Sequence, residues 1–268
     1  MIHLLERMLV FPAPSRRSGD WEPADLPYED LVFTGEDGTR LHGWYMPHPA
    51  PRAFLLYSHG NGEHVARLAP RLLELRERVG VAAFAWDYRG YGKSQGRPTA
   101  ELTIADARRA QLALAARAGI DPAEVVAVGH SLGGGVSVGL AARHEVRGLV
   151  LERTFARLQD AAAYHFPWLP VRWLMRNEFP SIEDIRRYCG PLLASHGTQD
   201  EVVPYAMGRE LFDACPSPWK EFFTIPEGRH NDPQPPEYDA TLADWLDRLS
   251  SRGTRAERNG QSLQASEG

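Results

Sequence analysis

The sequence predicts an α/β domain: a mainly parallel, eight-stranded sheet with helices on both faces and a small lid. From residue 54 onward, short apolar runs of strand character alternate with helical patterns. One of these runs, residues 125–128, leads directly into Gly129-x-Ser131-x-Gly133, a serine between glycines that opens a helix. The 268 residues are 43% hydrophobic, which is enough to bury the core of one large domain. These observations together favour a single domain with its sheet covered on both faces.

The chain begins with an apolar segment, residues 1–11, followed by a connector rich in proline and charge, residues 12–27. The first segment is too short to span a membrane. We expect it to fold back onto the domain, with attachment to a membrane surface or a partner as the alternative.

The domain itself is predicted at residues 28–249. Two strands, 31–33 and 41–46, are joined as a hairpin through Glu36-Asp37-Gly38 and form an antiparallel edge. The remaining strands are predicted at 54–57, 81–86, 125–128, 146–151, 192–195 and 221–225, and the helices at 65–79, 101–118, after Ser131, at 205–214 and at 236–249.

Two segments depart from this alternation. Residues 155–187 are long and rich in aromatic side chains between two strands, and we interpret them as a lid over the carboxyl edge of the sheet. Residues 250–268 are polar, small and charged without periodicity, which predicts a disordered tail.

Composition excludes several classes of function. The formal net charge is -5, so no strongly basic surface is expected, and nucleic acid is not a predicted partner. The two cysteines, Cys189 and Cys215, lack C-x-x-C spacing and a preceding secretory signal, so neither a disulfide framework nor a zinc site is predicted. A cytoplasmic location is the resulting expectation, with the membrane surface as a less favoured partner through residues 1–11.

The serine motif predicts a nucleophile at a sharp turn between a strand and a helix. A serine hydroxyl needs a histidine to accept its proton and an acid to orient that histidine. Asp200 follows the strand at 192–195 and His230 follows the strand at 221–225, which gives the order Ser, Asp, His at carboxyl ends of strands. Glu152, at another strand end, is the alternative acid.

Acyl transfer also needs donors for the developing oxyanion. The backbone amide of Leu132, directly after the serine, is one candidate. The amide of Asn61 is the second, because a flexible glycine on each side in Gly60-Asn61-Gly62 lets the chain turn it inward.

Other sequence patterns do not meet the requirements of the binding motifs that they resemble. Gly92-Lys93-Ser94 lacks the glycine that a phosphate-binding loop needs at position 87, which is Asp87. We expect Asp87 and Arg89 instead to fix the loop beside the site through a local ion pair. No residue pattern implies a cofactor or a bound metal.

These motifs resemble those of α/β-hydrolase-fold serine hydrolases across residues 28–249. The resemblance is carried by His59-Gly60-Asn61-Gly62, by residues 87–94, by the serine motif, and by the segments that contain Asp200 and His230. Leu151-Glu152-x-Thr154-Phe155 and Phe166-Pro167-Trp168-Leu169-Pro170 are similar to a short-lidded group. That group includes bud-emergence-type, depalmitoylase-like and bacterial serine aminopeptidase-like proteins.

The predicted activity is cleavage of a small-molecule carboxylic ester, thioester or amide through an acyl-enzyme on Ser131. The aromatic residues Phe166, Trp168 and Trp173 of the lid are candidates for binding the acyl chain. One alternative is an aminopeptidase-like enzyme, in which Glu178 or Glu183 would hold a substrate ammonium. Another is a catalytically silent binding scaffold.

Overall fold

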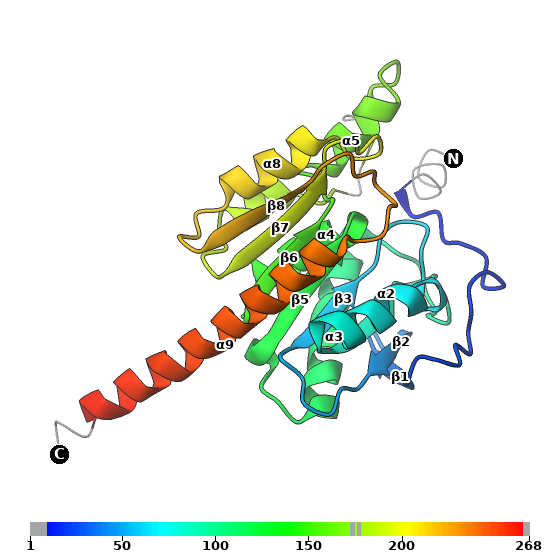
Figure 1. The fold of residues 1–268 in the computed structure, drawn as a ribbon. Coiled ribbons are helices and arrows are strands. Elements are labelled where there is room, and N and C mark those ends of the chain that lie inside the picture. The colour runs from blue at the N-terminus through cyan, green and yellow to red at the C-terminus, as the bar shows by residue number, and fades with distance from the viewer. Residues whose placement is uncertain (1–9, 172–174, 176–177, 265–268) are drawn as a thin grey trace.

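The eight predicted strands form one sheet. The computed structural model describes residues 10–171, 175 and 178–264, with the strand order β1-β2-β4-β3-β5-β6-β7-β8 (Figure 1). The strands are β1 (Glu29–Thr34), β2 (Arg40–Met46), β3 (Phe54–Ser58), β4 (Ala82–Asp87), β5 (Val125–His130), β6 (Gly148–Glu152), β7 (Leu192–Gly197) and β8 (Lys220–Ile225). The β1–β2 and β2–β4 pairs are antiparallel and all others are parallel, which confirms the predicted antiparallel edge.

Helices cover both faces, and alternate residues of β5 show it directly. Val126 and Val128 belong to a buried cluster with α2 (Ala69–Glu74), η2 (Leu75–Val79) and α9 (Pro236–Gln264), which cross the near face in Figure 1. Val125 and Ala127 belong to a second cluster on the other face. That cluster includes α3 (Ala100–Ala118), α4 (Leu132–Ala141), α7 (Ser181–Ile185) and α8 (Tyr205–Ala214). Burial on both faces explains why the central strands are apolar at most positions, with polar residues near their carboxyl ends.

Most element boundaries agree with the sequence prediction. The expected helix at 65–79 is divided into η1 (Val65–Arg67), α2 and η2, and Pro70 stands in the first turn of α2, where its missing amide hydrogen does no harm. The short η3 (Pro122–Glu124) precedes β5. α9 continues to Gln264, past residue 249, where we expected the domain to end. The disorder expected of residues 250–268 stays a prediction.

The segment between β6 and β7 contains α5 (Leu158–His165) and α7. It follows the carboxyl end of β6, on the edge where the serine turn also lies, so its place is the one expected of a lid. Whether it acts as a lid stays a prediction.

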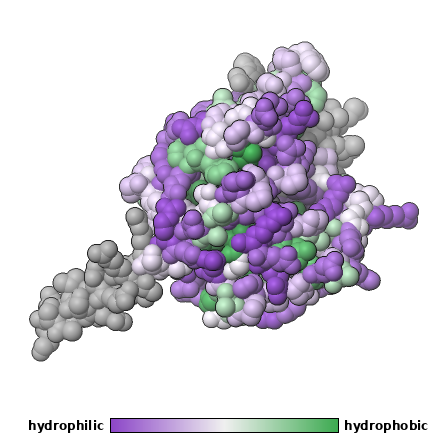
Figure 2. Space-filling view, in the orientation of Figure 1, coloured by the Kyte–Doolittle hydropathy of each residue, from purple (hydrophilic) through white to green (hydrophobic). Residues whose placement is uncertain are grey.

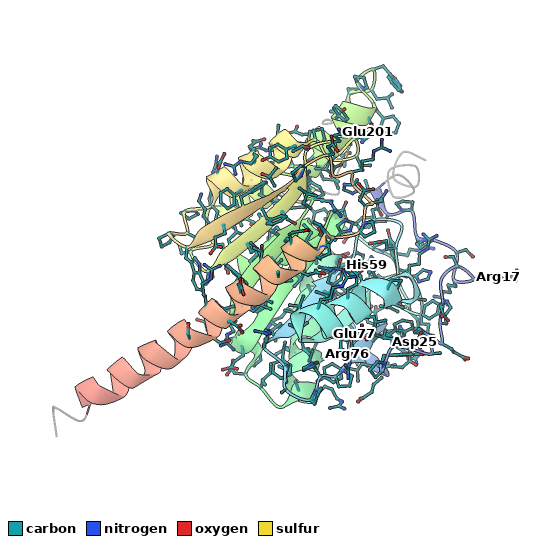
Figure 3. All side chains as sticks on the ribbon, viewed as in Figure 1. Arg17, Asp25, His59, Arg76, Glu77 and Glu201 are labelled. Atoms are coloured by element: carbon teal, nitrogen blue, oxygen red, sulfur yellow. The ribbon has the colours of Figure 1, made fainter. Side chains whose placement is uncertain are left out.

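The predicted apolar segment lies largely outside the described residues, which begin at Val10. The side chains of Val10 and Phe11 are buried, and the ring of Phe11 contacts that of Phe179 with 6.4 Å between centroids. The connector then runs along the outside of the domain, where Arg17 and Asp25 lie at its edge (Figure 3). In the view of Figure 2 most of the surface is hydrophilic, and hydrophobic residues form small separate areas.

Candidate active site

Ser131 lies at a strained turn between β5 and α4. Its φ of 53° and ψ of -116° are unfavourable for a residue with a Cβ atom, and such strain typically costs about 1–3 kcal/mol. The turn is held by the Ser131 amide, which donates to the Glu152 carbonyl at 2.9 Å, and by Thr154 Oγ1, which donates to the Ser131 carbonyl at 2.7 Å. The strand-turn-helix predicted from the motif is therefore present.

The glycines beside Ser131 are required by close packing. A Cβ atom on Gly133 would lie 1.9 Å from the Ser58 carbonyl oxygen, and one on Gly129 would lie 2.2 Å from the Gly133 carbonyl oxygen. Both distances are far below van der Waals contact and involve backbone atoms that cannot rotate away. Close approach of β5, α4 and β3 thus accounts for residues that helix propensity disfavours.

Ser131, His230 and Asp200 form one hydrogen-bonded chain. The distance from Ser131 Oγ to His230 Nε2 is 2.9 Å, and that from His230 Nδ1 to Asp200 Oδ2 is 2.8 Å. All three side chains are buried, with residue exposures of 8%, 6% and 6%. The structure therefore brings together the three residues that the sequence placed at the ends of β5, β7 and β8. In this arrangement a base is within reach of a hydroxyl, and an acid orients the base.

The carboxylate of Asp200 is fixed from several sides. Its Oδ1 atom accepts the backbone amides of Val202 and Val203 at 2.9 and 2.7 Å. Its Oδ2 atom faces both His230 and His196, whose Nε2 atom is 3.2 Å away. The sequence analysis did not assign a role to His196, although its spacing of four residues from Asp200 was a usable signal.

The pKa values of Asp200 and His230 both lie below their usual values. Burial alone would raise the pKa of Asp200, but hydrogen bonds from His196 and His230 hold it below its usual value. Burial lowers the pKa of His230, and its hydrogen bond to Asp200 opposes that change only in part. At neutral pH the acid is therefore ionised and the imidazole is neutral, which is the state that a general base requires.

Glu152, the alternative acid, faces away from this chain. Its side chain is buried beside Tyr57 and pairs with Arg71 at 3.3 Å, on the face of the sheet that α2 and α9 cover. Its backbone carbonyl, and not its carboxylate, contacts the serine turn. The geometry thus favours Asp200 over Glu152.

The loop after β3 lies next to the serine turn. The amides of Asn61 and Leu132 donate no hydrogen bond to any group that the structure describes. The Asn61 side chain is anchored, because its Nδ2 donates to the Val10 carbonyl at 2.9 Å and its Oδ1 accepts from Tyr91 at 2.9 Å. Two unengaged backbone amides, one next to Ser131 and one in the neighbouring loop, are the kind of donors that an oxyanion hole needs.

Glu63 is a further functional candidate that the sequence analysis did not assign. Its Oε2 atom accepts the Gly60 amide at 2.7 Å and lies 3.6 Å from His130 Nδ1. Burial alone would raise the pKa of Glu63, but its contact with His130 lowers that pKa to about 2. His130 thus points toward Glu63, and its ring lies 5.4 Å from that of His230. His59 stabilises the same loop, because its buried ring stacks on that of Tyr88 with 4.0 Å between centroids.

The lid residues named from the sequence occupy different environments. Phe166 is half-buried and contacts Trp168 with 5.9 Å between rings, whereas Trp168 is 73% exposed. Trp173 lies outside the described residues. Of the two candidate ammonium ligands, Glu178 is exposed and Glu183 pairs with Arg157 at 3.0 Å.

One expectation for the loop after β4 is wrong. Arg89 pairs with Asp106 and Asp37, both at 2.6 Å, and not with Asp87. Asp87 instead accepts the Val65 amide at 2.9 Å and contacts His42 at 3.1 Å. The side chains diverge because Asp87 ends β4 and points to the buried β2 neighbour, whereas Arg89 turns toward α3.

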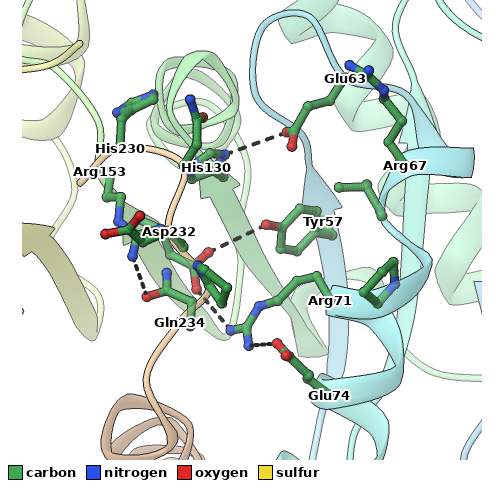
Figure 4. Close-up of a pocket in the computed structure, with 15 residues that line it drawn as sticks. Tyr57, Glu63, Arg67, Arg71, Glu74, His130, Arg153, His230, Asp232 and Gln234 are labelled. Carbon is green, nitrogen blue, oxygen red and sulfur yellow. Dashed lines mark hydrogen bonds and ion pairs between the residues drawn. The ribbon is translucent and has the colours of Figure 1, made fainter. Parts of the chain in front are cut away.

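A polar cavity of about 230 Å³ adjoins the catalytic chain through His230 (Figure 4). It lies between α2, the ends of β5 and β6, and the loop that carries His230. Across the described ranges, no cluster of three His, Cys, Asp or Glu side chains is placed to hold a metal ion. None of the helices in the described part of the chain is long and apolar enough to cross a membrane.

Comparisons with known proteins agree with this fold. Residues 49–184 match the family described as serine aminopeptidase, S33. An uncharacterized protein of Mycobacterium tuberculosis is 36% identical over 232 residues, which cover 85% of this chain and 81% of the relative. Human alpha/beta hydrolase domain-containing protein 17B is 35% identical over 184 residues, which cover 69% of this chain and 62% of that protein.

Solved structures show the same fold. The esterase Pf2001 of Pyrococcus furiosus superposes with a TM-score of 0.72 at 22% identity, covering 88% of this chain and 98% of the esterase. A Mycobacterium tuberculosis puromycin-hydrolyzing peptidase superposes with a TM-score of 0.64 at 18% identity, covering 82% of this chain and 38% of the peptidase.

Fold and site together define an α/β-hydrolase-fold enzyme, which confirms the resemblance seen in the sequence. The chain belongs to the serine aminopeptidase S33 family and is a hydrolase.

Proposed function

We propose that this chain hydrolyses a carboxylic ester or thioester of a small molecule through an acyl-enzyme on Ser131, with His230 as base and Asp200 as its orienting acid. The observation that carries the proposal is the unbroken chain from Ser131 Oγ through His230 to Asp200, with donor-acceptor distances of 2.9 and 2.8 Å. A neutral histidine in this position can accept the serine proton as the hydroxyl attacks a carbonyl carbon.

The reaction proceeds in two halves. Ser131 Oγ bonds to the carbonyl carbon while its proton passes to His230 Nε2, and the resulting imidazolium is stabilised by the Asp200 carboxylate. Collapse of the tetrahedral intermediate expels the leaving group, which takes that proton. A water molecule then attacks the acyl-enzyme while His230 accepts its proton. The second tetrahedral intermediate collapses, Ser131 Oγ takes that proton back, and the carboxylic acid is released.

The amides of Asn61 and Leu132 form the proposed oxyanion hole. Neither needs to break a hydrogen bond within the described chain before it binds the negative oxygen. Donors held in place cost little reorganisation, and one such donor is typically worth about 10²–10³-fold in kcat. The side-chain bonds of Asn61 to Tyr91 and Val10 support this role, because they anchor the residue that carries the amide.

We further propose that the segment 155–187 is a lid that sets acyl preference. Of the two acyl-binding candidates that the structure describes, Trp168 is the more exposed, so its ring is accessible to a substrate chain. Each methylene buried there contributes roughly 0.8 kcal/mol, so a few carbon atoms outweigh most polar effects at the leaving group. The alternative is that the aromatic residues of this segment only pack it against the sheet.

A substrate panel tests the proposal. Purified protein is assayed with p-nitrophenyl esters from acetate to octanoate, the matching acyl thioesters, and leucine p-nitroanilide, in parallel with Ser131→Ala. Ester or thioester turnover that disappears in the variant supports the proposal. Turnover that persists in Ser131→Ala at an unchanged rate refutes the nucleophile assignment.

An aminopeptidase activity is the second candidate, favoured by the family match over residues 49–184. It needs a carboxylate for the substrate ammonium. The exposed Glu178 is the better candidate, because Glu183 is engaged by Arg157. A kcat/KM for leucine p-nitroanilide above that for p-nitrophenyl butyrate would favour this function.

We also propose a cytoplasmic location. Cys189 is exposed and Cys215 is buried, and both are free thiols, as is usual in a reducing compartment. Fractionation that placed the protein with membranes would instead favour attachment through residues 1–11.

A further inference from the structure

Two arginines are buried to a similar degree but have different partners. Arg89 and Arg153 are 3% and 2% exposed. The guanidinium of Arg89 bonds to the carboxylates of Asp106 and Asp37. Arg153 bonds only to neutral acceptors, the Asp232 carbonyl at 2.8 Å and the Gln234 amide oxygen at 3.4 Å.

A buried cation without a counter-ion is costly, and proteins normally pair such a group or leave it in contact with solvent. None of the carboxylates that the structure describes forms an ion pair with Arg153. Its Nε atom is buried and has no hydrogen-bond partner, and the same holds for Nε2 of Gln234. The site therefore holds a fixed positive charge and unused N–H donors.

Arg153 and Gln234 both line the cavity of about 230 Å³ beside His230. Figure 4 shows Arg153 and Gln234 on one wall, Arg71 and Arg67 on the opposite wall, and His130 between them. A volume of this size holds roughly seven water molecules at about 30 Å³ each, so it accommodates a carboxylate with a few attached carbon atoms.

The acidic side chains of the cavity are already engaged. Glu152 pairs with Arg71 at 3.3 Å, Glu74 pairs with Arg71 at 3.4 Å, and Glu63 faces His130 at 3.6 Å. Asp232 is exposed, and its carboxylate accepts the Arg229 amide at 2.8 Å. None of these four carboxylates forms an ion pair with Arg153, so its charge is available to a ligand.

We propose that this cavity binds an oxyanion, a carboxylate or phosphate group, on Arg153 and Gln234. Charge-assisted hydrogen bonds from a guanidinium are the strongest that a protein offers to such a group. The anion supplies Arg153 with the counter-ion that the described part of the chain does not provide.

The position of the site indicates what it does. His230 lines the same cavity and, in the proposed mechanism, hands its proton to the leaving group. An anionic group bound here therefore lies on the leaving-group side of the reacting bond. The substrate class that fits is an ester whose leaving alcohol carries a carboxylate or phosphate. This extension rests on the proposed function, whereas anion binding itself does not.

Thermal unfolding of the full chain tests binding without any assay of activity. We expect sodium phosphate or sodium benzoate to raise the melting temperature relative to sodium chloride of equal ionic strength. A ligand at a hundred times its Kd stabilises a domain of this size by about 5–10 °C. Arg153→Gln should abolish the rise, and Arg248→Gln, an exposed arginine paired with Glu221, should retain it.

Gln234→Glu is the decisive variant, because it builds a counter-ion beside Arg153 with almost no change of shape. We expect it to melt at a higher temperature than the wild type in chloride and to gain nothing from phosphate or benzoate. It also tests the proposal if Arg153→Gln does not fold. The proposal is overturned if neither phosphate nor benzoate raises the melting temperature of the wild type. It is also overturned if both raise the melting temperature of Gln234→Glu as much as that of the wild type.

Kinetics distinguish an anionic leaving group from a separate small anion. The matched substrates are 4-(butyryloxy)benzoate and its methyl ester, which differ by one charge on the leaving group. If the substrate supplies the anion, Arg153→Gln should lower the ratio of their kcat/KM values by about ten- to a hundredfold. An unchanged ratio with intact phosphate binding supports a site for a free anion. If the wild-type protein hydrolyses neither ester, the proposed function is contradicted, but the result on anion binding still holds.

Discussion

Replacing Asp200 with asparagine should stop catalysis while leaving the fold in place. The carboxylate of Asp200 accepts the Val202 and Val203 amides on Oδ1 and faces His230 on Oδ2. An asparagine that keeps its oxygen on the two backbone amides must present its NH₂ group to His230 Nδ1. That nitrogen then has to accept a hydrogen bond, so the imidazole proton moves to Nε2.

The size of the activity loss follows from the wrong tautomer of His230. With a proton on Nε2, His230 cannot accept the proton of Ser131 across the 2.9 Å contact. The equivalent change in other serine triads costs about 10⁴-fold in kcat. Such a loss corresponds to about 5.4 kcal/mol of transition-state stabilisation.

The assay is kcat/KM for the best ester of the panel, with melting temperature and circular dichroism as controls for folding. Glu152→Gln is the matched variant, because it removes a buried carboxylate one strand away that contacts Arg71 and not His230. We expect it to change kcat/KM much less than Asp200→Asn does.

A Glu152→Gln variant that is folded and loses as much activity as Asp200→Asn would refute the reasoning. So would an Asp200→Asn variant with nearly normal turnover. Either result would mean that the acid which orients His230 during the reaction is not the one hydrogen-bonded to it here.

Five further outcomes are expected. Ser131→Ala should lower kcat by about 10³-fold or more with an unchanged melting temperature, because the triad acts as a unit; residual ester turnover at the wild-type rate would contradict this. The acidic limb of the kcat/KM profile should have its midpoint below about 6.5, because burial lowers the pKa of His230 and activity rises as pH increases through that pKa. His130→Gln should move this limb to higher pH, since a neighbouring positive charge that depresses the pKa of His230 is lost; an unshifted limb would count against the coupling. Trp168→Ala should reduce the preference for octanoate over acetate if the lid binds the acyl chain, and an unaltered preference would refute that role. Deleting residues 1–11 should lower the melting temperature if the segment packs on the domain, whereas lost binding to liposomes with unchanged melting would favour an anchor.

The fold could be predicted from the sequence because its signals are local. Each central strand is a short apolar run, and the hairpin turn carries Gly38, whose φ of 79° suits glycine. The triad was predictable for the same reason, since strand ends in a parallel sheet meet at one edge. Ser131 directly follows β5, and Asp200 and His230 lie in the loops after β7 and β8.

What sequence reasoning missed depends on side chains that meet across elements. Arg89 reaches Asp106 of α3 and not Asp87, which is nearer in sequence, and only the packing of the loop against α3 decides that. The contact of His130 with Glu63 joins residues 67 positions apart, and that of Arg153 with Gln234 joins residues 81 positions apart. Neither pair leaves a periodic or motif signal in the chain.

The proposed mechanism depends most directly on Ser131 being the nucleophile. The measurement is reaction of the wild-type protein with a fluorophosphonate probe, followed by mass spectrometry of the modified peptide. We expect one adduct per chain, located on Ser131, that is absent in Ser131→Ala and is reduced by competition with the best ester substrate. Active enzyme that forms no adduct, or an adduct on another residue that tracks the loss of activity, would contradict the central claim.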